Sequence, residues 1–153
     1  MALSGLRVID LSDERGIYGA KLLADLGAEV LRPEPPGGDP LRQRGPFLGN
    51  GNQANAVSLW HAFFASNRIG SEVDPSDAEQ VTHLQDLLVK ADIVLTCPGA
   101  FATDLLDMQK AQAANPGLIV VDLASFSANG PWRDYLAPDI VAGALGGAAA
   151  TTG

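Results

Sequence analysis

The sequence predicts an α/β fold in which a parallel β-sheet carries helices on both faces. Short apolar runs rich in β-branched residues alternate along the chain with stretches of helical periodicity. The apolar runs are continuous, which is typical of strands that are buried on both faces. With 153 residues, of which 46% are hydrophobic, the chain is long enough to bury a core, and we expect one domain over 1–153.

The first elements are a strand, a helix and a second strand. Residues 6–12 (LRVIDLS) form an apolar run that predicts a buried strand. Leucines and alanines at helical spacing predict a helix over 18–27. We expect this helix to end at Gly27, because glycine is common at helix C-termini. The run AEVLRPE predicts a second strand over 28–34.

A loop rich in turn-forming residues follows. Residues 35–52 contain four prolines and five glycines, which predicts irregular structure. An aromatic-rich stretch over 53–66 has helical spacing, and residues 71–74 predict a brief strand. Asp74 and Pro75 are suited to cap and begin the next helix, which runs to about residue 91.

The last part of the chain continues the alternation. Apolar runs and helical spacing predict a strand at 92–96, a helix at 104–114, a strand at 118–125 and a helix rich in small residues at 138–152. Ligands of parallel sheets bind at the carboxyl ends of strands, which here fall at 12–16, 34–39, 74, 96–100 and 125–131.

The residues at the first strand end argue against a dinucleotide cofactor. Gly16 and Gly19 do not have the G-x-G-x-x-G spacing that brings the backbone close to a pyrophosphate. Asp13 and Glu14 precede them and would repel that group. We therefore expect no dinucleotide.

The sequence assigns no metal ligand and no catalytic residue. His61 and His83 lie in different predicted helices without a ligand at the spacing that zinc sites use. Cys97 lies at a strand end but has no recognisable histidine partner, so we interpret it as structural. A G-x-S-x-G nucleophile motif is absent.

Charge and composition limit the partners. The chain carries 18 acidic and 10 basic residues, for a net charge of −8, which argues against general nucleic-acid binding. Four arginines near strand ends or in the long loop could each hold a phosphate or pair with the surplus carboxylates: Arg32, Arg42, Arg44 and Arg68. The single cysteine, the absence of a membrane-length apolar run and the absence of a signal-peptide pattern lead us to expect a cytoplasmic protein without membrane contact.

Several segments in unbroken order resemble the N-terminal portion of class III CoA-transferases, the family of formyl-CoA and carnitine-CoA transferases and α-methylacyl-CoA racemase. These segments are LSGLRVIDLS, LLADLGAEVLRPEPPGGDPLR, FFASNR, ADIVLTCPGA, NPGLIVVDLASFSANGPW and PDIVAGALGGAAATTG. The resemblance implies a Rossmann-like domain that binds coenzyme A or acyl-CoA as a substrate. It also implies a dimer of interlocked chains, so we expect a homo-oligomer or a partner chain that supplies the second domain.

The resemblance implies acyl transfer through an aspartate that carries the acyl group. In the family this aspartate follows the segment that matches GGAAATTG, which ends here at Gly153. Asp139 matches an upstream acidic position, so no residue of this chain is assigned as catalytic. Pro138 occupies the place of the histidine that racemases use, which disfavours racemisation.

The resemblance also implies a coenzyme A site, with departures from the family pattern. The turn after the fourth major strand is one residue shorter than in the family and has Cys97 where an aromatic residue is usual. The family's Asn-Lys-Arg-Ser reads here from Asn67 to Gly70, with one cation fewer. The expected site residues are Arg15, Arg68, Val73, Thr96, Cys97, Pro98 and Gly99.

Two functions remain open from the sequence. The first is a CoA-transferase domain that becomes active when further sequence or a partner chain completes it. The second is a degenerate, non-catalytic domain used for dimerisation or assembly, which the departures in the ligand loops favour.

Overall fold

The computed structural model describes residues 1–49 and 56–152. They divide into two compact units, Met1–Leu123 and Ala124–Gly153, each of which is described by itself. That residues 1–153 form a single coenzyme A-binding domain stays a prediction.

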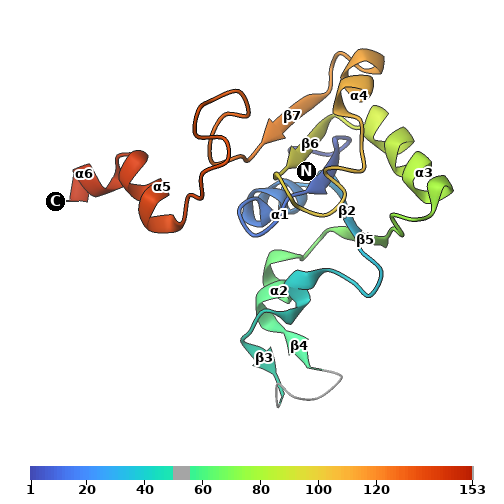
Figure 1. Ribbon diagram of the computed structural model, residues 1–153. Coiled ribbons are helices and arrows are strands. Elements are labelled where there is room, and N and C mark those ends of the chain that lie inside the picture. Colours follow the sequence, from blue (N-terminus) through green and yellow to red (C-terminus); the bar gives the residue numbers. More distant parts are fainter. Residues whose placement is uncertain (50–55, 153) are drawn as a thin grey trace. The chain divides into compact units, whose positions relative to one another are not determined.

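The first unit is built on a five-stranded sheet whose neighbouring strands are all parallel (Figure 1). The order is β5-β2-β1-β6-β7. The chain starts at β1 and adds β2 and then β5 on one side. It then returns to the other side of β1 and adds β6 and β7 there. This confirms the predicted parallel sheet. The strands are β1 (Arg7–Leu11), β2 (Glu29–Glu34), β5 (Ile69–Glu72), β6 (Ile93–Thr96) and β7 (Ile119–Asp122).

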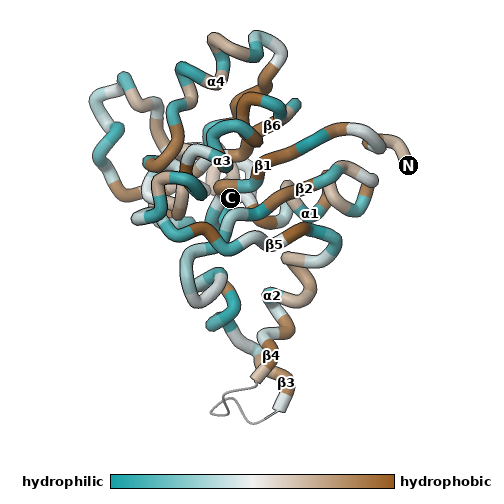
Figure 2. Tube along the Cα trace, turned by 90° about the vertical axis from the view of Figure 1, so that its right-hand side faces the viewer, coloured by the Kyte–Doolittle hydropathy of each residue, from teal (hydrophilic) through white to brown (hydrophobic). Residues whose placement is uncertain are grey.

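Helices cover both faces of this sheet, as predicted. Val8 of β1 packs with Ala20 of α1 in one buried cluster, whereas Ile9 packs with Leu88 of α3 in another. This alternation places α1 on one face and α3 with α4 on the other. Figure 2 shows the hydrophobic residues concentrated along β1 and β6. The helices are α1 (Ile17–Asp25), α3 (Ala78–Val89) and α4 (Met108–Ala114).

The helix α1 ends at the predicted glycine. Gly27 has a φ of 103°, and its N–H donates to the Ala24 carbonyl at 2.9 Å. The Ala28 N–H donates to the Leu23 carbonyl at 3.0 Å, which completes a Schellman motif. A glycine is favoured here because other residues rarely adopt this left-handed conformation.

The helix α3 starts later than the sequence predicted. Asp77 is its N-cap and accepts from the N–H groups of Glu79 at 2.9 Å and Gln80 at 3.2 Å. Asp74 accepts instead from the Ser76 N–H at 2.8 Å. The expected cap at Asp74 with Pro75 in the first turn is therefore wrong, because these residues form a separate turn before the helix.

The predicted helix over 53–66 is shorter in the structure. Residues Val57–Ser58 form β4, which pairs antiparallel with β3 (Phe47–Leu48), and α2 spans Leu59–Phe64. Ser58 caps α2 by accepting from the His61 N–H at 3.0 Å, which fixes the helix start. The expected helix at 53–55 and the expected loop at 50–52 lie outside the described residues.

Other boundaries shift by a few residues. The predicted loop over 35–52 contains a short 3₁₀ helix, η1 (Pro40–Gln43). The strand expected at 71–74 is β5, which begins earlier at Ile69. The helix expected from 104 begins at Met108, because Asp107 caps it by accepting from the Lys110 N–H at 2.8 Å.

The second unit contains two short helices instead of one helix over 138–152. These are α5 (Asp139–Leu145) and α6 (Ala148–Thr152), separated at Gly147, which has a φ of 86°. Its left-handed backbone interrupts the helix.

Among the described residues of both units, none of the helices is long and apolar enough to cross a membrane.

Candidate functional site

A cavity lies at the carboxyl ends of the central strands of the first unit. Its volume is about 210 Å³, and its lining comprises residues 10–14, 39–41 and 99–101 together with Arg32, Pro33 and Pro35. The loops after β1 and β6 both contribute to it, and the strand order reverses between these two strands. Parallel α/β sheets bind ligands at this kind of position.

Arg15 connects the two loops beside this cavity. Its guanidinium forms an ion pair with Asp13 at 2.7 Å and donates to the Pro98 carbonyl at 3.3 Å. Burial disfavours the ionised Asp13 carboxyl, but the hydrogen bonds from Arg15 outweigh this and lower the pKa of Asp13. The Arg15 side chain is 40% exposed, so it is accessible to a ligand at the strand ends.

A buried network of charges lies next to the cavity. Asp10, which is fully buried on β1, accepts from Arg32 Nη1 at 3.1 Å and from Arg68 Nη1 through one carboxylate oxygen. Its other oxygen accepts from the Ser12 N–H at 3.0 Å and the Ser12 hydroxyl at 2.5 Å. This network joins β1 and β2 to the residue directly before β5.

The same network extends into the loop after β2. Arg32 Nε donates to Asp39 at 2.5 Å, and Asp39 in turn accepts from the Leu41 N–H at 2.9 Å. Glu34 accepts from the Asp39 N–H at 2.9 Å and pairs with Arg42 at 2.8 Å. Burial acts against ionisation of Asp39, yet its bonds to Arg32 hold the pKa of this carboxyl below its usual value.

Comparison with protein families decides the assignment. The sequence model that represents CoA-transferase family III matches residues 3–153, which is nearly the whole chain.

The chain belongs to CoA-transferase family III.

Curated relatives of this family III chain are considerably longer than it is. The "Succinyl-CoA--D-citramalate CoA-transferase" of Chloroflexus aurantiacus is 34% identical over 99% of this chain and 37% of the relative. The "Acetyl-CoA:oxalate CoA-transferase" of Acetobacter aceti is 30% identical over 97% of this chain and 38% of the relative. The chain thus spans less than two fifths of the length of these two relatives.

Solved structures agree with the family assignment. A CAIB/BAIF family protein from Brucella suis superimposes with a TM-score of 0.79 and 27% identity, over 95% of this chain and 39% of the other. The protein Rv3272 from Mycobacterium tuberculosis gives a TM-score of 0.76 and 28% identity over 95% of this chain and 40% of the other. The parallel sheet of the family III chain is therefore shared with these proteins.

The structure brings together part of the predicted coenzyme A site. Arg15 contacts Pro98, the Cys97 thiol interacts with Asp13, and Gly99 lines the strand-end cavity. Thr96 is buried at the end of β6, directly before these residues. These predicted positions converge on the loops after β1 and β6.

The other two predicted residues are placed differently. The Arg68 side chain is only 1% exposed, and its guanidinium donates to Asp10 and to the Phe64 carbonyl. Val73 is buried in the hydrophobic core, and its N–H donates to the Glu34 carbonyl at 2.8 Å. Neither Arg68 nor Val73 lines the strand-end cavity.

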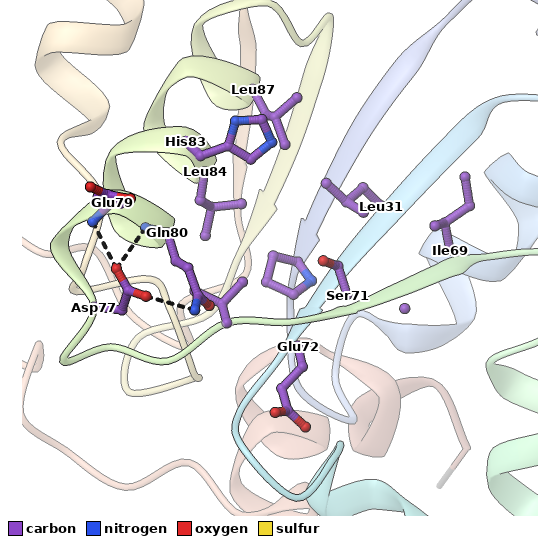
Figure 3. A pocket seen from close by; sticks show the side chains of 13 residues that line it. Leu31, Ile69, Ser71, Glu72, Asp77, Glu79, Gln80, His83, Leu84 and Leu87 are labelled. Atoms are coloured by element: carbon purple, nitrogen blue, oxygen red, sulfur yellow. Dashed lines mark hydrogen bonds between the residues drawn. The ribbon is translucent and has the colours of Figure 1, made fainter.

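Val73 borders a second and larger pocket, with a volume of about 800 Å³, between β5 and α3. Figure 3 shows Leu84 and Leu87 of α3 across from Leu31 and Ile69 of the sheet. This pocket lies along one face of the sheet at the edge strand, so it does not occupy the position where the strand order reverses. We therefore place the candidate site at the smaller cavity.

The buried network was not predicted from the sequence. Asp10 interrupts an apolar strand run and Arg32 interrupts another, and a charge in such a place is a signal for a buried partner. Asp39 gave no such signal, because it lies in a loop rich in proline and glycine. In the described parts of the chain, no cluster of three or more histidine, cysteine or acidic residues is arranged to hold a metal ion.

Cys97 is expected to be unreactive in the folded chain. Its side chain is fully buried, and burial raises the pKa of the thiol to about 11, which leaves little of the reactive thiolate at neutral pH. A disulfide reagent at pH 8 should label the native chain at least about a hundredfold more slowly than the chain in denaturant. Because Cys97 is the single cysteine, the labelling rate reports on this position alone. Equal rates in both states would show that the thiol is accessible.

Proposed function

We propose that this chain is the coenzyme A-binding portion of an acyl-CoA:carboxylate CoA-transferase, completed by further sequence or by a partner chain. The observation that carries the proposal is the cavity between the loops after β1 and β6, where the strand order reverses. The two curated relatives described above are named for CoA transfer, which supports this reaction class.

The charges around the cavity suggest how coenzyme A would lie. Four carboxylates line the cavity against one guanidinium, that of Arg32: Asp10, Asp13, Glu14 and Asp39. Phosphates are disfavoured there, so the uncharged arm of coenzyme A is the part that suits the interior. The phosphates then lie at the rim, where Arg15 is exposed.

The loop after β6 adds polar backbone to this arrangement. Gly99 has a φ of 76° and open space where a side chain would project, so the backbone can approach a ligand closely. In the proposed site, residues 96–99 contact the ligand mainly through backbone groups, and Arg68 acts only indirectly, by holding Asp10 in place. The chemical step is nucleophilic catalysis by an aspartate outside these 153 residues.

Calorimetry with coenzyme A tests the proposal. The wild-type chain should bind, and Arg15→Ala should weaken binding about tenfold, since a charge-assisted hydrogen bond to phosphate is lost. The matched control is Arg133→Ala, because Arg133 is an exposed arginine of the second unit that pairs with its neighbour Asp134. The control should bind like the wild type.

The alternative is a non-catalytic domain that serves assembly. It is favoured by the engagement of Arg32 and Arg68, two arginines near the strand ends, in buried ion pairs with carboxylates. Absence of coenzyme A binding at millimolar ligand, with an unchanged circular dichroism spectrum, would favour this alternative. Under either function we propose a cytoplasmic chain that acts as a homo-oligomer or with a partner chain.

A further inference from the structure

The arginines near the strand ends differ in how firmly they are paired. Arg32 and Arg68 are buried against carboxylates, and Arg15 and Arg42 each make several hydrogen bonds to one carboxylate. Arg44 has an ion pair with Glu14 at 3.4 Å, in which both side chains are about half exposed. A long, exposed pair contributes little free energy, so a ligand can replace it at low cost.

The position of the Arg44 guanidinium is nevertheless defined by its surroundings. It lies over the ring of Trp60, with 5.1 Å between the guanidinium carbon and the ring centroid. The Arg44 backbone is fixed on both sides, since its N–H donates to the Leu41 carbonyl at 3.2 Å and its carbonyl accepts from the Ser58 hydroxyl. Stacking on an aromatic face orients a guanidinium while its edge remains available to an anion.

This guanidinium pairs with a residue of the strand-end cavity. Glu14, its partner, is one of the residues that line that cavity. An anionic group of a ligand in the cavity would therefore compete with the Glu14 carboxylate for the same donors.

We propose that Arg44 recognises an anionic group of the ligand, a carboxylate or a phosphate, by exchanging Glu14 for it. This deepens the proposed function, on which it rests for the identity of the ligand. A carboxylate would come from the acid substrate and a phosphate from coenzyme A.

The test measures binding of three probes by calorimetry: coenzyme A, succinate and inorganic phosphate. Arg44→Gln should weaken binding of the recognised probe about tenfold or more, and Arg44→Lys should restore part of the loss. Arg133→Gln, at an exposed arginine of the second unit, is the matched control and should change nothing. Loss for succinate alone assigns a carboxylate site, whereas loss for coenzyme A and phosphate assigns a phosphate site.

Glu14→Gln gives the opposite and more diagnostic result. Removal of the competing carboxylate should tighten binding about threefold, and the gain should disappear when Arg44→Gln is added, because the two side chains act through one another. A gain that persists in the double variant, or wild-type affinity of Arg44→Gln for every probe, overturns the inference while coenzyme A binding stands. Succinate binding that depends on Arg44, without coenzyme A binding, supports the inference and contradicts the proposed function. Absence of binding of all three probes contradicts both.

Discussion

Asp10→Ala is expected to lower the free energy of unfolding by about 3–5 kcal/mol, because it leaves buried guanidinium groups without their carboxylate. Asp10 is fully buried and accepts from Arg32 and from Arg68, whose side chain is 1% exposed. Burial lowers the pKa of Arg68, but an arginine remains charged in a protein and cannot avoid the cost by losing its proton. Denaturant unfolding followed by circular dichroism measures the loss.

The matched control for this variant is Asp134→Ala. Asp134 pairs with Arg133 at 3.2 Å, but the two side chains are 84% and 63% exposed, so its removal should change stability by less than about 0.5 kcal/mol. Similar losses for the two variants would mean that the Asp10 network contributes no more than a surface pair.

Gly70→Ala is expected to destabilise the chain by about 1–3 kcal/mol through overpacking. A Cβ atom at Gly70 would lie 2.5 Å from Glu34 Oε1, although residue 70 is on an exposed edge strand. The Glu34 carboxylate would have to move, and its ion pair with Arg42 at 2.8 Å and its bond from the Asp39 N–H would be disturbed.

Gly19→Ala separates this packing effect from the general effect of replacing a glycine. Gly19 lies within α1 and has no atom within 4 Å of the place where its Cβ would be. Alanine there should stabilise the chain by about 0.5–1 kcal/mol, because a helical glycine loses more backbone entropy than alanine. If both variants were stabilised, the close approach of Glu34 to Gly70 would be wrong.

The fold could be predicted from the sequence because its signals are local. Continuous apolar runs marked the strands at 6–12, 28–34, 92–96 and 118–125, all of which are present with shifted ends. Helix starts were less predictable, because Asp74 and Asp77 are both suitable caps and only the turn between them decides which one is used.

The candidate site could be predicted only in part. The loops at 12–16 and 96–100 follow from the rule that ligands bind at strand ends. The side chain of Arg68 could not be placed, because its partner Asp10 is 58 residues away and sequence patterns do not show which charges meet. The resemblance to class III CoA-transferases, which the family match confirms, identified the protein class but not these contacts.

An amide NMR titration of the 153-residue chain with coenzyme A locates the bound ligand. We predict that the shifted resonances belong to residues 12–16, 97 and 99–101, which surround or adjoin the strand-end cavity. Shifts confined to residues 69–73 and 79–87, around the larger pocket beside α3, would contradict binding at the strand-end cavity.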